Sequence, residues 1–334
     1  MFTFTPTISK RLITTVGLCA TLSAIPLSAA LAQTDAYPSR PIHLVVPFPP
    51  GGGTDLIGRA VAMQLANDTG WTVVVDNKGG AGGTIGVDAA AKAKPDGYTL
   101  VLGQTSNLAI GPWLYKSLPY NPKTDLTPIG LVSVSPIAMA TGANTPYKTF
   151  ADVVNASKEK PGSITLGFSG NGTVAHLSGT SIEKTSGIEL THIPYKGASQ
   201  AMTDLIGGGI DLYMSSIPTL LNQIRAGQLR AIAVTSPERA PELPDTPSLS
   251  ESGYKDFDLQ SWWGILAPAG VPADVVETVN KALNQALQNP ELIEKLQASG
   301  GQVLGGTPEQ FQTYLDQEIE RWGTLVKESG VTMQ

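Results

Sequence analysis

Cysteine and histidine are almost missing from this chain, which has one cysteine and three histidines in 334 residues. Cys19 lies in an N-terminal segment that we expect to be removed, which leaves the mature protein without a thiol, a disulfide or a cysteine-based metal site. His43, His176 and His192 lack the spacing of metal ligands, and the sequence has neither an HExxH motif nor a GxSxG nucleophile elbow. We therefore predict a protein that is not an enzyme and that uses no metal and no cofactor.

Basic residues are also few. The chain has 22 Lys and Arg against 28 Asp and Glu, a net charge of −6, and loss of Lys10 and Arg11 with the N-terminal segment would leave a net charge of −8. An acidic protein is a poor partner for nucleic acid or for an anionic membrane surface. Beyond the N-terminal segment, no apolar run reaches the roughly 20 residues that a membrane span requires. We expect no nucleic-acid binding and no membrane span in the mature protein.

The first 32 residues have the features of a secretory signal peptide. Two basic residues precede an apolar stretch that ends near Pro26, and Ala30 and Ala32 give the small-x-small pattern of a cleavage site. The apolar stretch is too short for a transmembrane anchor, and Leu18 before the cysteine is too bulky for a lipoprotein signal. We expect export, with cleavage after about Ala32.

What the chain does contain is a regular alternation of β-branched runs and helical patterns. Strands are expected at 42–46, 72–75 and 98–102 in a first block, and at 164–168, 189–193, 210–214 and 230–234 in a second, with helices between them. Such alternation predicts an α/β fold in which right-handed crossovers join parallel strands. An all-helical end, 273–329, has no strands of its own and is expected to pack on the first block.

A mature chain of about 300 residues exceeds the usual size of one hydrophobic core, so we expect two lobes. Lobe 1 is predicted from 33–138 and 262–334, and lobe 2, from 139–261, is inserted into it. The two crossings would form a hinge near 133–141 and 259–267. Each lobe would be a mainly parallel sheet flanked by helices, with a ligand in the cleft where the carboxyl ends of the strands meet.

Two glycine-rich turns each follow an apolar run and open into a helical pattern, at 47–55 (PFPPGGGTD) and at 77–84 (NKGGAGGT). Prolines remove donors from the start of the first turn, so the N–H groups of its three glycines and of Thr54 remain to point at a ligand. Unpaired N–H groups at the positive end of a helix dipole hold an anion, and neither turn contains an arginine. Capping explains Thr54 and Asp55 about as well as ligand contact does. We expect the two turns to converge on one carboxylate.

In the second block, the turn 169–175 (SGNGTVA) matches the dinucleotide pattern GxGxxA, but no acidic residue ends the next strand to bind a ribose. We interpret this turn as another site for an anion or a polar ligand. For His176, which follows it, ligand contact and a structural hydrogen bond both remain open. Tyr195 and Lys196 end a strand and are expected at the cleft, whereas core packing is favoured for the pair Trp262–Trp263.

Eight motifs occur in an order that resembles the Bug family, the periplasmic solute-binding receptors of bacterial tripartite tricarboxylate transporters. They are YPSRPI, LVVPFPPGGGTD, VVVDNKGGAGGTIG, PDGYTL, LPYNP, HIPYKG, LRAIAVTSPER and LAPAGVP, and they cover essentially the whole mature chain. The resemblance implies a periplasmic, type II-like Venus flytrap, a monomer, that binds a small carboxylate and has membrane transporter subunits as partners. The ligand contacts that it implies are Phe48, Pro49, Pro50, Gly51, Gly52, Gly82, Gly83, Thr84, Thr105, Ser106, Ser169, Asn171, Thr173, His176, Tyr195, Lys196, Gly197 and Ser215.

Two positions depart from the family pattern. Gly79 stands where relatives often have the proline of an Asn-Arg-Pro-Gly turn, which is expected to loosen the second turn. Ser215 stands where many relatives have an aspartate that could pair with a ligand amino group, so the sequence argues against an amino-acid ligand. Di- and tricarboxylates remain, as do aromatic carboxylates stacked on Phe48, Tyr195 or a tryptophan. A periplasmic carboxylate sensor and a cleft enzyme remain as alternative functions.

Overall fold

The structure is a computed structural model that describes residues 1–5, 37–254 and 257–332. The expected signal peptide lies outside the described residues, apart from its first five. The chain divides into two units, Met1–Ala36 and Tyr37–Gln334, and the helices and strands described below belong to the second. None of the described helices combines the length and the apolar character that a membrane span needs.

The first part of the sheet contains the parallel strands β2, β1 and β3, and β9 and β4 extend it with antiparallel pairing. Its elements are β1 (Ile42–Val46), α1 (Gly53–Thr69), β2 (Val73–Asn77), α2 (Thr84–Ala91), β3 (Thr99–Gln104), α3 (Gly111–Leu114), β9 (Gln260–Pro268), α8 (Ala273–Leu287), α9 (Pro290–Ala298), β10 (Gln302–Val303) and α10 (Pro308–Ser329). The helices that follow β9 agree with the expected helical end, but the short strand β10 lies among them and pairs with β4, so the end is not all-helical. Helix α8 packs on α1.

The second part of the sheet contains the parallel strands β7, β5 and β6. Its elements are β4 (Leu126–Gly142), α4 (Phe150–Glu159), β5 (Thr165–Phe168), α5 (Val174–Ser186), β6 (Thr191–Pro194), α6 (Ala198–Ile206), β7 (Leu212–Ser216), α7 (Ile217–Arg225) and β8 (Leu229–Val234). The long strand β4 pairs with β9 as far as Pro136 and with β7 from Ile137 onward. The expected parallel pairing is therefore present for β7, β5 and β6, but β8, expected in the same alternation, pairs antiparallel with β4. Antiparallel strands join the parallel units into one mixed sheet.

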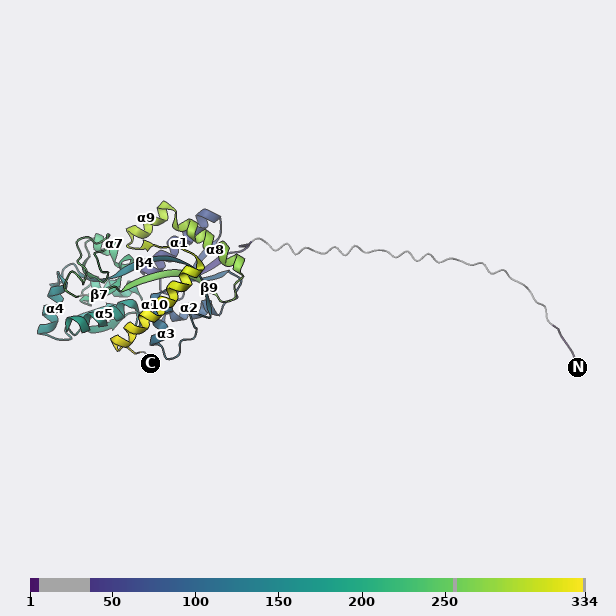
Figure 1. The fold of residues 1–334 in the computed structure, drawn as a ribbon, viewed down its shortest axis with the longest axis horizontal. Helices are drawn as coiled ribbons and strands as arrows, with labels where there is room; N and C mark the ends of the chain where they lie inside the picture. The colour runs from purple at the N-terminus through teal and green to yellow at the C-terminus, as the bar shows by residue number, and fades with distance from the viewer. Residues whose placement is uncertain (6–36, 255–256, 333–334) are drawn as a thin grey trace. The chain divides into compact units, whose positions relative to one another are not determined.

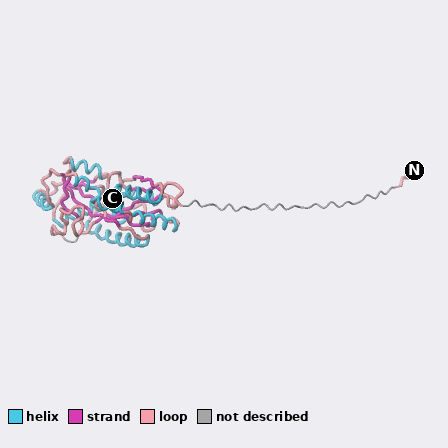
Figure 2. Tube along the Cα trace, turned by 90° about the horizontal axis from the view of Figure 1, so that it is seen from above, coloured by secondary structure: helices cyan, strands magenta, loops and turns pink. Residues whose placement is uncertain are grey.

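Helices lie on the outside of the strands, as Figure 2 shows. The C-terminal helix α10 crosses the long strands β4 and β9 (Figure 1) and packs on β4. The α/β architecture predicted from the alternating pattern is thus confirmed, with the longest strands running through the middle of the layer.

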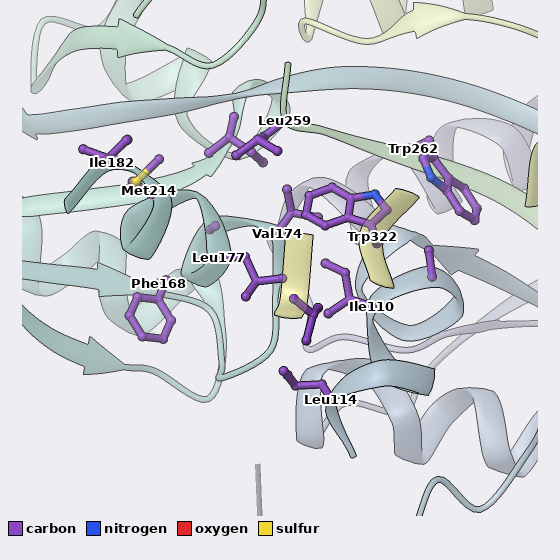
Figure 3. Close-up of a cluster of buried hydrophobic side chains, with 14 of the residues drawn as sticks. Ile110, Leu114, Phe168, Val174, Leu177, Ile182, Met214, Leu259, Trp262 and Trp322 are labelled. Atoms are coloured by element: carbon purple, nitrogen blue, oxygen red, sulfur yellow. The ribbon is translucent and has the colours of Figure 1, made fainter. Parts of the chain in front are cut away.

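Strand β9 carries two tryptophans whose side chains point to opposite faces, because neighbouring residues of a strand alternate. Trp262 packs with Trp322 of α10 in a cluster that also holds Leu177 of α5 (Figure 3). Trp263 packs in a second cluster with Leu102 of β3. Both indoles are at most 1% exposed, so core packing, the favoured interpretation of this pair, is what the structure shows.

Candidate ligand-binding cleft

A cavity lies where the carboxyl ends of parallel strands from both parts of the sheet meet, which is the usual position of a ligand in an α/β fold. It holds about 540 Å³ of empty space, its open mouth included. Its lining consists of Phe48, Pro49, Gly52, Gly53, Thr54, Gln104, Ser106, Ile137, Ser169, Thr173, Val174, Ala175, Gly197, Ala198, Ser215, Ser216, Thr219, Ser261 and Trp263.

Four of the described helices, α1, α5, α6 and α7, begin at this cavity. The N-caps of α1 and α6 are the glycines Gly52 and Gly197, and neither helix start has a side-chain cap. By contrast, α4 and α10 begin with complete capping boxes. Helix starts without side-chain caps leave N–H groups available and present the positive end of the helix dipole. The cavity therefore combines several partial positive charges.

The lining of the cavity mixes apolar and polar residues and carries no formal charge. Among the described residues that form it, none is Asp, Glu, His, Lys or Arg. The backbone N–H groups of Gly52, Ala175 and Ala198 have no hydrogen-bond partner within the described part of the chain. Such groups donate charge-assisted hydrogen bonds to a carboxylate, which are stronger than bonds between neutral groups. This arrangement suits one anionic head group.

A buried network holds the first glycine turn in place. Asn77 donates through Nδ2 to the Phe48 carbonyl at 3.0 Å and to Asp55 Oδ1 at 2.9 Å. Asp55 also accepts from the Gly51 N–H at 3.0 Å, and its Oδ1 lies 2.9 Å from Arg59 Nε. Burial raises the pKa of Asp55, but the hydrogen bonds from Arg59, Gly51 and Asn77 outweigh it and lower the pKa below its ordinary value. Arg59 thus neutralises the Asp55 carboxylate, which in turn holds the first glycine turn in place.

Replacing Asp55 by asparagine should destabilise the fold. The variant loses the charge that faces Arg59 and places an amide donor where the carboxylate accepts, so we expect the free energy of unfolding to fall by roughly 2 kcal/mol at neutral pH. Because folding lowers the pKa of Asp55, its stabilising effect is complete above a pH of about 4 and is lost as the pH falls through the lowered pKa. Urea unfolding at neutral and at acidic pH measures both values. A difference between the proteins that grows in acid would contradict this account.

The second glycine turn faces an outer hollow, of about 1160 Å³ with its open mouth included. This outer hollow is lined by Phe48, Pro49, Gly79, Gly80, Ala81, Gly82, Gly83, Tyr115, Ser169, Gly170, Asn171, Pro194, Tyr195 and Lys196. A Cβ added to Gly83 would lie 2.5 Å from Asn107 Nδ2 and 3.0 Å from the Phe48 ring. Phe48 and Pro49 of the first turn line the outer hollow as well as the cavity. The convergence of both turns on one carboxylate stays a prediction.

Most of the contact residues expected from the sequence line the cavity or the outer hollow. The expected residues that line neither are Pro50, Gly51, Thr84, Thr105 and His176. Gly51 is bound to Asp55, as described above. Thr84 donates to the Ala81 carbonyl at 3.0 Å, and Thr105 Oγ1 accepts from the Trp262 N–H at 2.9 Å. These side chains shape the turns around the ligand site.

His176 makes a structural hydrogen bond. Its Nδ1 accepts from the Gly172 N–H at 3.2 Å, and its ring stacks on Phe168 with 4.6 Å between the centroids. Burial, together with the nearby His192, lowers the pKa of His176 to about 4. The ring is therefore neutral at physiological pH and can accept this bond, which holds the turn at 169–173.

Tyr195 is also held by a protein partner, because its hydroxyl donates to Asp204 at 2.7 Å. Burial, and then this hydrogen bond to a carboxylate, raise the pKa of Tyr195 to about 12. The next residue, Lys196, is exposed and lines the outer hollow. The outer hollow therefore has a cation at its rim, in contrast to the cavity.

Hydrogen bonds join the two sides of the cavity across its mouth. They run from the Gly53 N–H to Thr219 Oγ1 at 3.0 Å, from Ser199 Oγ to the Pro50 carbonyl at 3.2 Å, and from the Val174 N–H to Ser106 Oγ at 3.3 Å. Each of these bonds links an element of the first part of the sheet to one of the second. These three bonds hold the two sides of the cavity together in this structure.

Sequence reasoning missed lining residues that belong to no glycine turn. They are Gln104, Ile137, Thr219 and Ser261. Gln104 follows the buried Leu102 and Gly103 on β3, and Ser261 precedes the buried Trp262 and Trp263 on β9. The one sequence signal for Gln104 and Ser261 was a polar residue at the end of an apolar strand face.

Comparison with known proteins identifies the family. Residues 57–331 match the model of the tripartite tricarboxylate transporter family receptor. Over 325 residues the chain is 36% identical to protein BugT of Bordetella pertussis. The match covers 97% of this chain and 99% of BugT.

Two solved structures resemble the chain as a whole. A Rhodopseudomonas palustris protein with adipate is 31% identical, with a TM-score of 0.86 over 89% of this chain and 99% of that one. MatC of the same organism, with bound malate, is 28% identical, with a TM-score of 0.82; the match covers 87% of this chain and 100% of MatC. The chain therefore belongs to the tripartite tricarboxylate transporter receptor family, as its ordered motifs predicted.

Proposed function

We propose that this chain is a periplasmic solute-binding protein that captures a small carboxylate in the cavity and delivers it to a tripartite tricarboxylate transporter. The observation that carries the proposal is the convergence of helix N-termini from both parts of the sheet on a cavity without formal charge. Helix N-termini with free N–H groups are anion sites. The membership of the chain in a receptor family supports delivery to a transporter.

The free energy that such a site supplies is sufficient for useful affinity. Hydrogen bonds to a charged group contribute about 1.5–3 kcal/mol each, and a helix dipole adds about 0.3–1 kcal/mol. A dissociation constant of 1 μM requires about 8.2 kcal/mol net of the cost of association. One carboxylate bound by several N–H groups, together with an enclosed ligand body, meets that requirement without an arginine.

We further propose that the two lobes predicted from the sequence, 33–138 with 262–334 and 139–261, close around the ligand. The exchange of β4 between partners at Pro136 and Ile137 supports a hinge near 133–141. The second crossing, near 259–267, falls on β9. Opening would break the three hydrogen bonds that cross the mouth of the cavity.

The ligand range that we propose is a di- or tricarboxylate or an aromatic carboxylate. Adipate and malate, which occupy the two related structures, are both dicarboxylates and support the first class. The described lining offers no carboxylate, imidazole or amine to act as a general acid or base, which supports binding without turnover.

A panel of carboxylates and their neutral amide analogues tests the proposal. A carboxylate that fits should raise the melting temperature in a concentration-dependent way, because a ligand present at 100 times its dissociation constant adds about 2.7 kcal/mol of stability. The amide analogue of the same shape should bind far more weakly, since it cannot accept charge-assisted hydrogen bonds. Equal binding of acid and amide would refute capture of an anion. Loss of carboxylate uptake on deletion of the gene would support delivery to a transporter, and an intact uptake would contradict it.

A further inference from the structure

Two buried polar side chains of the cavity lack a protein partner. Gln104, at the end of β3, and Ser261, near the start of β9, are 6% and 4% exposed. Both line the cavity, and neither side chain makes a hydrogen bond to another described residue. The two strands are direct neighbours, with Gln104 opposite Trp263 in the register. Two polar groups without a protein partner thus line the cavity from neighbouring strands.

Strand periodicity places these groups at the end of one apolar face. Gln104 follows Leu102 by two residues, and Ser261 precedes Trp263 by two, so each shares a face with its apolar partner. Leu102 and Trp263 pack in the same hydrophobic cluster. Polar residues therefore replace apolar ones where this face reaches the cavity.

The other hydroxyl groups of the lining are largely engaged by the protein. Thr54 Oγ1 accepts from Trp263 Nε1 at 2.9 Å, and Thr219 Oγ1 accepts from the Gly53 N–H at 3.0 Å. Ser169 Oγ lies 2.5 Å from the Tyr213 hydroxyl. Hydrogen-bonding capacity for a ligand body thus remains at Gln104 and Ser261.

The chemistry of this pair selects a neutral partner. The polar atoms of both side chains are open to the cavity, so a ligand that hydrogen-bonds to both is favoured over one that displaces their water and presents carbon to them. A second carboxylate of the ligand would be a poor partner for Gln104 and Ser261, because the described lining has no cation to compensate its desolvation. An amide and a hydroxyl can both donate and accept, which matches a ligand hydroxyl group.

We propose that Gln104 and Ser261 bind a hydroxyl group on the ligand, so that the protein selects hydroxycarboxylates over carboxylates that lack the hydroxyl. This inference rests on the proposed function, because the helix N-termini must first hold the carboxylate. A second carboxylate of the same ligand would lie toward the outer hollow, where Lys196 is the cation.

Malate and succinate form a matched pair of probes, since they differ by one hydroxyl group. Titration calorimetry on the unmodified protein should show malate binding roughly tenfold more tightly or better. In Gln104→Leu and in Ser261→Ala the preference should shrink, chiefly through weaker malate binding. Ser261→Ala removes a single atom and serves if the larger change impairs folding.

Gln260→Leu is the matched control. This residue neighbours Ser261 on β9 but faces the other way, into a separate hollow with Val134 and Pro136. It should keep the malate preference of the unmodified protein.

Equal affinity of the unmodified protein for malate and succinate would overturn the inference and leave carboxylate binding intact. A preference that survives both Gln104→Leu and Ser261→Ala would also overturn it. If no member of the carboxylate panel binds, the proposed function itself fails. That result differs from equal binding of malate and succinate, which would refute only the hydroxyl site.

Discussion

Replacing Glu318 by alanine is expected to lower the free energy of unfolding by about 4 kcal/mol. Glu318 is 6% exposed on α10, and its Oε2 accepts from Trp262 Nε1 at 2.9 Å and from Trp322 Nε1 at 3.0 Å. Its Oε1 accepts from Arg321 at 3.1 Å. Truncation leaves two buried indole donors without an acceptor, and each such group costs about 1–3 kcal/mol. Urea unfolding followed by tryptophan fluorescence measures the loss.

Two further variants separate the indole contacts from charge. Glu318→Gln keeps an oxygen that can accept from both indoles, so we expect a loss of only about 1 kcal/mol. Glu320→Ala removes an exposed carboxylate two residues along the same helix, 3.8 Å from Lys123, and should change stability by less than about 0.5 kcal/mol. If Glu318→Ala lowered the free energy of unfolding no more than Glu320→Ala, the Glu318 carboxylate would not hold α10 against β9.

This contact shows where sequence reasoning stops. The helical pattern of 308–329 predicts α10, and its lack of neighbouring strands predicts that it packs on other elements. Which carboxylate meets which indole depends on the rotation of the helix over β9, and Glu318 looks like any other acidic residue of an exposed helix. The pair Trp262–Trp263 was interpretable as core, but the alternation that sends one indole to α10 and the other toward the cavity needs the strand pairing.

The candidate site was predictable to a similar extent: its local turns were found, but the packing between them was not. The first glycine turn was found because tripled glycine after a strand and before a helix is typical of a turn that binds an anion. The second turn carries the same signal, yet its glycines line the outer hollow and not the cavity, and no local pattern reveals that placement. Gln104 and Ser261 lie on neighbouring strands only because β9 returns beside β3 from more than 150 residues away in the sequence, which no motif encodes.

Replacing Gly53 by valine is expected to weaken carboxylate binding by about 100-fold, or about 2.7 kcal/mol. Gly53 is the first residue of α1, and an added Cβ would lie 2.8 Å from Ser216 Oγ and 3.0 Å from Thr219 Oγ1 on the opposite side of the cavity. Its φ is not positive, so valine meets no backbone strain there, and its cost falls on the approach of α1 to α7. Titration calorimetry with the carboxylate that binds best gives the affinity, and urea unfolding of the ligand-free protein should change by less than about 1 kcal/mol.

Alanine at two helix starts provides the graded control for that variant. Gly53→Ala should give an intermediate loss of affinity, because its single methyl group still meets the two hydroxyl groups. Gly111→Ala, at the start of α3, should bind as the unmodified protein does, since an added Cβ there meets nothing nearer than 3.5 Å. The expected order follows from contact across the cavity and not from loss of glycine as such. Full affinity in Gly53→Val would mean that the ligand binds without the closure that joins α1 to α7, and the two-lobe mechanism would then have to be abandoned.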